Sequence, residues 1–315
     1  MTVDGGGTKL IAILFNERYE LVSCGRGKGI NPNFDTLDSI AQTMRDCVEE
    51  CLSGYDGITI ETLYICMPGP HELYAETVQS KAQVNNVISL GEGLMSTLAA
   101  IQKTTGYMAL AGTGSGVCYV NGDRVRHKGG WGGLLGDQGS GFIIGRDGLF
   151  AVVQAYENWG PKTRLYDLLM EAWNLDHIHE ILPKVYRAKS YRYVIASVAP
   201  LVSKAAKEGD RVCVRILERA GEDMAAQMIA LIREVGLHGD IFPTGGVWKG
   251  CRIMYDVFCD RIYSEYPQAN IRLPVFEPVI GGVVRNAMGD RDSLDEETII
   301  HLSNKFSEYL YKTNW

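Results

Sequence analysis

Several features that would assign a chain to other classes of protein are missing from this sequence. No apolar run approaches the roughly 20 residues that a membrane-spanning helix needs. The start of the chain lacks the basic and then apolar segments of a secretion signal, so we expect a cytoplasmic protein. No dense run of lysine and arginine occurs, and the formal net charge is −7, which argues against a nucleic-acid-binding surface. A small-molecule partner fits this composition better than a nucleic acid or a membrane.

Because no secretion signal is seen, the eight cysteines are expected to be free thiols, and there is no glycosylation sequon to suggest an extracellular protein. Cys47 and Cys51 are the one close pair, and their spacing could supply half of a metal site. Apolar residues recur around them with the helical period over 37–52, which places both thiols on the buried stripe of a predicted helix. Core packing is the interpretation that this pattern favours.

Glycine, in contrast, is abundant, with 36 residues among 315, and it is clustered. The stretch 129–141 contains seven glycines in thirteen residues around one tryptophan, one carboxylate and one amide. Three further clusters occur, which read Asp4-Gly5-Gly6-Gly7-Thr8-Lys9, Ala111-Gly112-Thr113-Gly114-Ser115-Gly116 and Pro243-Thr244-Gly245-Gly246-Val247-Trp248. Glycine this dense allows the backbone to approach a ligand closely or to adopt a positive φ.

These clusters have the chemistry of a nucleotide site. Glycine turns leave backbone N–H groups available for phosphate oxygens, a Thr or Ser hydroxyl adds a donor, and an Asp can hold Mg²⁺. Each cluster alone is more often a tight hairpin, but four of them indicate a nucleotide cleft. The glycines at 25–29 lack the Gly-Lys-Ser/Thr ending of a P-loop, so we interpret 25–33 as a loop.

The pattern of apolar residues predicts a mixed α/β chain. A strand at residue 3 and another over 10–15 predict a hairpin with its tip at the first glycine cluster, followed by a more polar strand over 19–24. Strands and helices then alternate to about residue 105, and a second hairpin over 117–125 repeats the design. Residues 141–236 are largely helical, with clear pieces at 166–170, 194–206 and 211–235, and Gly236 caps the last. Ser293-x-x-Glu296 predicts a capping box and a final helix through Tyr309.

The sequence resembles the N-acetylglucosamine kinase branch of the BadF/BadG/BcrA/BcrD ATPase family. The resemblance rests on the order of the four glycine clusters, on Asn31-Pro32-Asn33 after the first, and on Gly-Gly-Trp-Gly-x-Leu-Leu-Gly-Asp-Gln-Gly-Ser-Gly at 129–141. The resemblance spans almost the whole chain. It implies a two-domain actin-like (ribonuclease H-like) ATPase fold of the α/β class with a central interdomain cleft. We assign residues 1–105, joined by a C-terminal helix over 292–315, to one such domain and 106–291 to the other.

The resemblance also implies roles for individual residues, with ATP and Mg²⁺ as cofactors. Asp4 is expected to hold the metal ion. The phosphate and adenosine contacts are expected from Gly6, Gly7, Thr8, Lys9, Gly112, Thr113, Gly114, Gly245 and Gly246. The residues that fall where the kinases line the sugar pocket are Asn31, Ser115, Gly130, Trp131, Asp137 and Gln138.

Two positions depart from the family pattern. Relatives take the proton of the sugar hydroxyl with an Asp, whereas the matching stretch here reads Leu90-Gly91-Glu92-Gly93, so Glu92 stands in for the base. One extra methylene moves the carboxylate by about a bond length, a scale to which phosphoryl transfer is sensitive. At the position of Gln138 many relatives carry Glu. Gln138 removes that negative charge, and a less acidic pocket would better tolerate an acidic sugar.

Structural interpretations compete with several of these roles. Ser89-x-x-Glu92 has the spacing of a capping box, so Glu92 could bond to the Ser89 backbone instead of acting as a base. Asn31, before a proline, could form an Asx-turn. Trp131 could pack or face a ligand, and Trp248 could stack on the base or belong to the core.

The sequence therefore predicts an ATP-dependent amino-sugar kinase, with N-acetylglucosamine phosphorylated at its 6-hydroxyl as the default reaction. N-acetylmuramic acid, glucosamine or another hexose are the next substrates to consider. Two alternatives from other classes are a nucleotide-driven activator, as in the other branch of the family, and a sugar-binding sensor without kinase activity. Relatives are commonly homodimers, and the resemblance extends that possibility to this chain.

Overall fold

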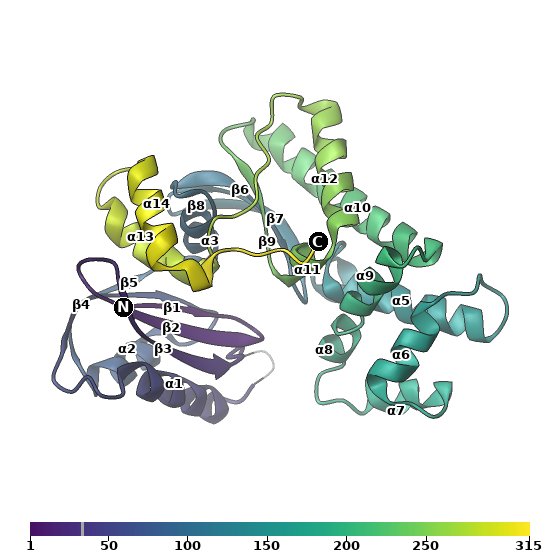
Figure 1. The fold of residues 1–315 in the computed structure, drawn as a ribbon, viewed down its shortest axis with the longest axis horizontal. Coiled ribbons are helices and arrows are strands. Elements are labelled where there is room, and N and C mark those ends of the chain that lie inside the picture. The colour runs from purple at the N-terminus through teal and green to yellow at the C-terminus, as the bar shows by residue number, and fades with distance from the viewer. Residues whose placement is uncertain (33–34) are drawn as a thin grey trace. The chain divides into compact units, whose positions relative to one another are not determined.

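A computed structural model of the chain describes residues 1–32 and 35–315 and shows two compact units (Figure 1). The first unit consists of Met1–Gly106, Val120–Val125 and Leu273–Tyr311, and the second of Tyr107–Tyr119, Arg126–Arg272 and Lys312–Trp315. Each unit contains β-strands covered by helices, which agrees with the predicted α/β class. The assignment of ribonuclease H-like domains to 1–105 with 292–315 and to 106–291 stays a prediction.

The first unit is built on a five-stranded sheet of order β3-β2-β1-β4-β5. Its strands are β1 (Thr2–Gly5), β2 (Lys9–Phe15), β3 (Leu21–Lys28), β4 (Thr59–Cys66) and β5 (Gln83–Ser89). β1 runs antiparallel to β2 and parallel to β4, and β5 runs parallel to β4. The predicted first hairpin is confirmed, with Gly5 opposite Leu10 at its tip.

The glycines at 25 and 27 lie in a strand, so the prediction of a loop from residue 25 was wrong. β3 continues to Lys28 and pairs with β2 along its whole length, with Gly25 opposite Ala12. A Cβ atom at position 25 would lie 1.9 Å from the carbonyl oxygen of Cys47 in helix α1 (Leu37–Leu52). Glycine is used here because a helix crosses the strand closely, a reason that the local sequence does not reveal.

Helices cover both faces of this sheet (Figure 1). They are α1, α2 (His71–Gln79), α3 (Glu92–Ile101), η2 (Pro278–Ile280), α13 (Gly281–Met288), α14 (Glu296–Lys305) and η3 (Ser307–Tyr309). On one face α1 buries Cys47 and Cys51 in the apolar core against the sheet, which confirms the packing interpretation of that pair. On the other face Gly282 of α13 approaches Thr2, since a Cβ on Gly282 would lie 2.2 Å from the hydroxyl oxygen of Thr2.

The last helix is shorter than predicted and has another cap. Its N-cap is Asp295, whose Oδ1 accepts the N–H of Thr298 at 2.8 Å, and the helix ends at Lys305. Ser293 instead forms a β-bridge with Lys103, so the predicted capping box is wrong. Both Ser293 and Asp295 are good cap residues, and the bridge decides between them.

The second unit combines a four-stranded sheet of order β8-β7-β6-β9 with a large helical part. Its strands are β6 (Thr105–Ala111), β7 (Ser115–Asn121), β8 (Arg124–Gly129) and β9 (Ile241–Thr244), except that residues 105–106 and the strand residues within 120–125 are counted with the first unit. Its helices are α4 (Gly132–Leu135), α5 (Gly141–Tyr156), α6 (Leu165–Trp173), η1 (Ile178–Glu180), α7 (Ile181–Tyr186), α8 (Tyr191–Ala196), α9 (Ala199–Lys207), α10 (Arg211–Val235), α11 (Gly246–Gly250) and α12 (Arg252–Glu265). The predicted hairpin at 117–125 and the helix at 211–235 with its Gly236 cap are confirmed.

One predicted helix of this unit is divided. Residues 194–206 belong to α8 and α9, which are separated at Ser197 and Val198. Pro200 lies in the first turn of α9, where its missing N–H is not needed, so the proline marks a start rather than an interior position. The division gives α8 a direction of its own, and α8 packs on α5.

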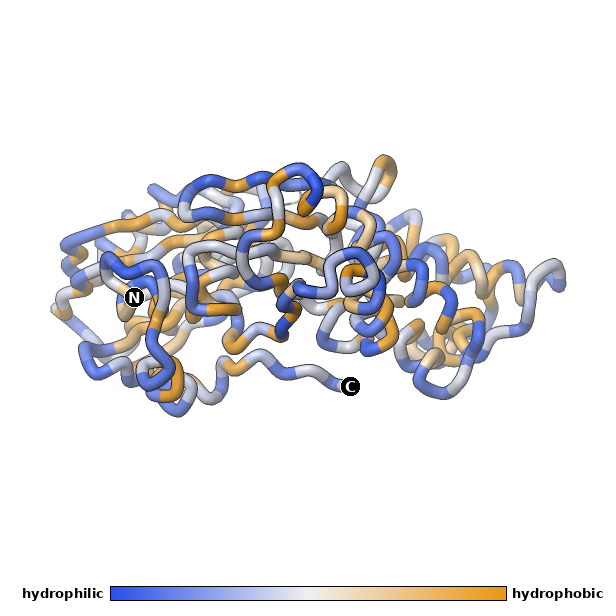
Figure 2. Tube along the Cα trace, turned by 90° about the horizontal axis from the view of Figure 1, so that it is seen from above, coloured by the Kyte–Doolittle hydropathy of each residue, from blue (hydrophilic) through white to orange (hydrophobic). Residues whose placement is uncertain are grey.

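The helices of this unit are amphipathic. In Figure 2 their traces alternate between blue and orange, as expected when one face is buried. α10 begins at Asp210, whose Oδ1 accepts the N–H groups of Val212 at 2.9 Å and Cys213 at 3.0 Å. Among the residues with described positions, none of the helices combines the length and the apolar character that crossing a bilayer requires.

Candidate active site

The tip of the first hairpin is an open turn made by the first glycine cluster. The N–H of Gly6 donates to the carbonyl oxygen of Lys9 at 2.9 Å, which closes the turn. The side chains of Thr8 and Lys9 are exposed, and a Cβ on Gly6 would meet no atom within 4 Å. Gly6, Gly7, Thr8 and Lys9 thus form an uncrowded turn of the kind that surrounds an anion.

Asn31 lies beside this turn. The N–H of Ile30 donates to the carbonyl oxygen of Gly6 at 3.0 Å. A Cβ on Gly29 would lie 2.1 Å from the carbonyl oxygen of Gly7, so the two backbones are in direct contact. The structure therefore brings Asn31 next to the turn of the first glycine cluster, while Asn33 of the same motif lies outside the described residues.

Two carboxylates lie at the carboxyl ends of parallel strands: Asp4 within the last residues of β1, and Glu92 shortly after β5. Asp4 is opposite Cys66 on β4, and Ser89 at the end of β5 is opposite Ile65 on the same strand. Glu92 follows three residues after Ser89, as the first residue of α3. The carboxyl edge of such a sheet is where ligands bind in open α/β folds.

Burial raises the pKa values in this group, and neighbouring charges raise those of Asp4 and Cys66 further. Burial raises the pKa of Asp4 to about 6; Lys9 acts in the opposite direction, and Glu92 and Glu277 raise it further. The Glu92 residue retains solvent exposure, but the surrounding protein displaces enough water from its carboxyl group to raise its pKa as well. Burial, followed by the charges of Asp4 and Glu92, raises the pKa of the Cys66 thiol. Perturbed acids next to an open turn mark a candidate functional site.

Glu92 is not the third residue of a capping box, so that alternative is wrong. The N-cap of α3 is Gly91, which provides no side-chain cap. The Ser89 hydroxyl instead shares a hydrogen bond of 2.8 Å with a ring nitrogen of His71. A charged side chain in the first turn of a helix is stabilised by the helix dipole without being tied to one donor. Its carboxylate is thus available for a proton.

In the second unit, the second glycine cluster is fixed by the start of α5. The N–H of Gly112 donates to the carbonyl oxygen of Gly114 at 2.9 Å, which makes the turn. The N–H groups of Gly141 and Phe142 donate to the carbonyl oxygens of Gly112 and Thr113, at 2.8 and 3.3 Å. The turn and the helix therefore form one hydrogen-bonded structure.

The fourth cluster lies against the same strand end. Gly245 has a φ of +102°, and a Cβ there would lie 2.4 Å from the carbonyl oxygen of Ala111, so only glycine fits. A Cβ on Gly246 would meet no atom within 4 Å. Trp248 is fully buried and donates from Nε1 to the carbonyl oxygen of Ala109 at 2.9 Å, so of its two predicted roles the structure supports core packing.

Ser115 and Gly130 join the second cluster to the long glycine-rich loop. Ser115 is buried and its hydroxyl donates to the carbonyl oxygen of Gln138 at 2.7 Å. The N–H of Gly130 donates to the carbonyl oxygen of Ser115 at 3.0 Å, and Gly130 has a φ of +73°. Both residues therefore hold the loop in place by these contacts.

Asp137 is the fixed centre of this loop. It is 3% exposed and adopts a φ of +60°, which is rare for a residue with a Cβ. Its Oδ1 accepts the N–H of Gly132 at 3.2 Å, and its Oδ2 accepts an N–H of the Arg192 guanidinium at 2.9 Å. A strained residue held by several partners is a frequent feature of binding sites.

The side chains of Trp131 and Gln138 are the exposed members of the predicted sugar site in this loop. Trp131 is 73% exposed, so its ring is not core packing. Gln138 is also exposed and lines a small hollow behind the loop. An exposed tryptophan flanked by glycines is available to a ligand.

Two residues that sequence reasoning missed belong to these groups. Arg192 lies 55 positions beyond its partner Asp137, on a short helix with no motif of its own, and no local signal identifies it. Glu277 contributes to the raised pKa of Asp4 from a segment far along the chain. The one sequence feature that could have identified Glu277 is its position directly before Pro278 and close to the Gly281-Gly282 pair.

Within residues 1–32 and 35–315, no set of three or more His, Cys, Asp or Glu side chains is close enough to hold a metal ion by itself. A metal here would need ligands from a substrate as well as from Asp4. Mg²⁺ is commonly bound in this way, through one or two carboxylates, water and substrate phosphates. The donor set around Asp4 fits that mode of binding.

The fold, with glycine turns and carboxylates at strand ends, is that of sugar kinases of the actin-like ATPase class. A candidate N-acetylglucosamine kinase from Chromobacterium violaceum has a solved structure that is similar, with a TM-score of 0.67 and 21% identity, over 90% of this chain and 96% of that chain. Residues 2–285 match the family model of the BadF/BadG/BcrA/BcrD ATPases. The chain belongs to this family, as its motifs predicted.

Two curated relatives are similar to this chain over about two thirds or more of their length. An N-acetylmuramic acid/N-acetylglucosamine kinase of Clostridium acetobutylicum is 24% identical over 295 residues, 90% of this chain and 96% of the relative. An N-acetyl-D-glucosamine kinase of Dictyostelium discoideum is 30% identical over 219 residues, 68% of this chain and 67% of the relative.

Proposed function

We propose that this protein is an amino-sugar kinase that transfers the γ-phosphoryl group of ATP to the 6-hydroxyl of N-acetylglucosamine. The observation that carries the proposal is the pair Asp4 and Glu92, at the carboxyl edge of one sheet beside the open turn of Gly6 to Lys9. The names of the two relatives support an N-acetylated amino sugar as the acceptor. The Clostridium relative also makes N-acetylmuramic acid a substrate to test.

The residues of the chain divide the work of this reaction. Asp4 would hold Mg²⁺, and the ion, when bound, neutralises charge on the β- and γ-phosphates. The turns at 6–9 and 112–114 would contact phosphate oxygens, and Gly245 and Gly246 the adenosine. Asn31, Ser115, Gly130, Trp131, Asp137 and Gln138 would line the sugar site. Glu92 would accept the proton of the sugar hydroxyl while the new O–P bond forms and the bond between the γ-phosphorus and ADP breaks.

Turnover with a panel of sugars tests the proposal directly. We expect ADP release in the presence of Mg²⁺ to depend on added N-acetylglucosamine or N-acetylmuramic acid, with less release for glucosamine and glucose. The matched control is the same mixture without sugar. Equal hydrolysis with and without sugar would contradict the kinase assignment, and would favour the activator; no turnover with any sugar would favour the sensor.

The rate should also fall in acid. The value of kcat/KM for Mg·ATP reports the free enzyme, in which the pKa of Asp4 is about 6. As the pH drops through that value Asp4 becomes neutral and no longer attracts a cation. Burial also raises the pKa of Glu92, so protonation of the proposed base acts in the same direction. We therefore expect kcat/KM to decrease steadily between about pH 7 and pH 5. A rate that stays constant to pH 5, in protein shown to remain folded there, would exclude these assignments.

A further inference from the structure

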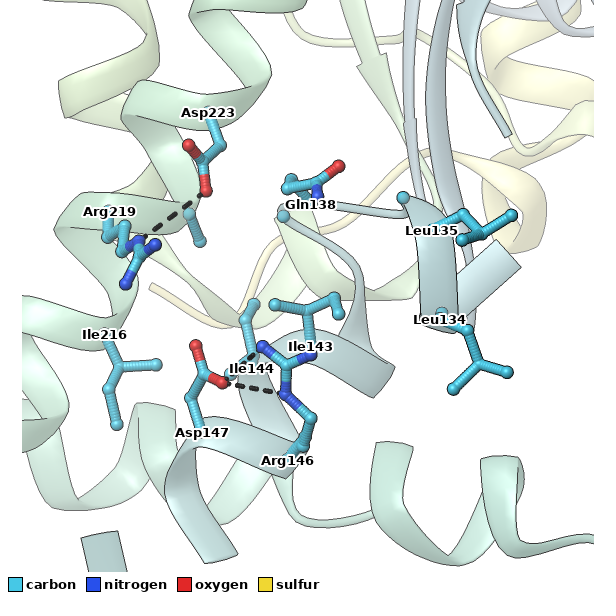
Figure 3. A pocket seen from close by; sticks show the side chains of 14 residues that line it. Leu134, Leu135, Gln138, Ile143, Ile144, Arg146, Asp147, Ile216, Arg219 and Asp223 are labelled. Carbon is cyan, nitrogen blue, oxygen red and sulfur yellow. Dashed lines mark hydrogen bonds and ion pairs between the residues drawn. The ribbon is translucent and has the colours of Figure 1, made fainter. Parts of the chain in front are cut away.

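A groove of about 600 Å³ lies between α5 and α10 in the second unit. None of its lining residues belongs to the site assigned above. It adjoins a smaller hollow of about 150 Å³ behind the glycine-rich loop, with which it shares Arg146, Asp147, Ile216 and Arg219. Figure 3 shows the smaller hollow, where dashed lines join Asp147 to Arg146 on α5 and Arg219 to Asp223 on α10.

The groove is positively charged although the chain as a whole is acidic. Its ionisable lining residues are Arg146, Arg215, Arg219 and Asp147, which gives three positive charges against one negative, whereas the whole chain has a net charge of −7. A local excess of this sign attracts anions. Arginine is the side chain best suited to phosphate, because its planar fork binds two oxygens at once.

The arginines are free to reorganise around a ligand. Arg146 pairs with Asp147 at 2.8 Å and Arg219 with Asp223 at 4.0 Å, but both arginine side chains are largely exposed, at 52% and 76%. Exposed ion pairs of this kind contribute little free energy, so a phosphate can replace them at small cost. Arg215 is exposed and has no salt-bridge partner among the described residues.

Two exposed aromatic side chains lie at the groove beside the arginines. Phe150, which lines the groove, is 58% exposed, and it meets Trp159, which is 57% exposed, edge to face with ring centroids 5.8 Å apart. Gln154 adds an amide to the lining. Exposed rings next to arginines and an amide can hold a molecule with an anionic end and a ring with apolar C–H faces.

We propose that this groove binds a phosphorylated sugar, at a site separate from the one that carries out the reaction. The phosphate would lie on Arg215, Arg219 and Arg146, and the sugar ring on Phe150. The volume is within the roughly 300–1,000 Å³ typical of small-molecule sites. The inference goes beyond the proposed function, because it depends on the groove alone.

Binding of N-acetylglucosamine 6-phosphate and of inorganic phosphate, measured by titration calorimetry, tests this site. The groove variant is R215S/R219S, and the matched control is R187S/K204S, which removes two exposed positive charges from the same unit outside the groove. We expect the groove variant to bind the sugar phosphate at least about tenfold more weakly, or to lose one of two binding events, while the control binds like the unmodified protein. Phe150→Ser tests the proposed contact between the sugar ring and Phe150. This variant should bind the sugar phosphate severalfold more weakly and bind inorganic phosphate with unchanged affinity.

Equal binding by the groove variant and the control would overturn the proposal, because the ligand would then occupy the catalytic site alone. An unchanged affinity for the sugar phosphate in Phe150→Ser would exclude the placement of the ring. Light scattering on each variant adds a further outcome: a dimer that becomes monomeric only in R215S/R219S would identify the groove as an interface between two copies instead. All three readouts are independent of ATP turnover, so failure of the kinase assignment is distinguishable from failure of the groove.

Discussion

Replacement of Glu92 by glutamine is expected to lower kcat for sugar phosphorylation by about 10²–10⁴-fold, the usual contribution of a general base. The amide has nearly the same shape as the carboxylate but cannot accept the proton of the sugar hydroxyl. Since Glu92 begins α3 without tying its side chain to a cap, the fold should tolerate the change. KM for the sugar should change much less than kcat, which steady-state kinetics measures directly.

Glu72→Gln is a matched control for that experiment. Glu72 is exposed and lies in the first turn of α2, as Glu92 lies in the first turn of α3, so both substitutions remove the same favourable interaction with a helix N-terminus. Only the Glu92 variant should lose activity. A Glu92→Gln protein with full turnover would show that another group takes the proton, or that none is needed.

Arg192→Met is expected to damage both the stability of the second unit and its use of the sugar. The substitution removes the partner of Asp137, whose side chain is 4% exposed, and leaves a carboxylate buried without its ion pair. We expect a loss of about 3 kcal/mol in the free energy of unfolding, the lower end for a broken buried pair, because Arg192 is 25% exposed. KM for the sugar should rise at least about tenfold, as the loop around Asp137 loses its anchor.

A double variant separates the two effects. In R192M/D137N both charges are removed, so urea unfolding should show most of the lost stability restored. The sugar KM should remain high, because Asp137 is assigned to the sugar site and has lost its carboxylate. Arg192→Lys, which keeps a charge but not the planar guanidinium, should fall between the unmodified protein and Arg192→Met. If R192M/D137N recovers the KM as well, Arg192 and Asp137 only stabilise the loop.

The strands and helices with clear local patterns were predictable. The helix at 211–235 has an aspartate before it and a glycine after it, and the structure gives the same limits. The hairpin at the start of the chain was visible from its apolar run and its glycine turn. These elements follow from interactions between residues close in sequence.

The errors and omissions come from contacts between residues far apart in sequence. The glycines at 25 and 27 were interpreted as a loop, because the close crossing of α1 over the strand cannot be seen in the sequence. The helix start at Asp295 depended on a bridge between Ser293 and Lys103. Arg192 reaches Asp137 from a separate helix, and only the fold brings the pair together.

The bonds between α5 and the second glycine cluster have a directional consequence. In a planar trans peptide the C=O and the following N–H point in opposite directions. The carbonyls of Gly112 and Thr113 point toward the first amides of α5. The N–H groups of Thr113 and Gly114, which belong to the same two peptide planes, must therefore point away from the helix. The first two N–H groups of α5 are therefore used to orient the turn. An anion bound at this turn would meet the N–H groups of Thr113 and Gly114, not those of the helix.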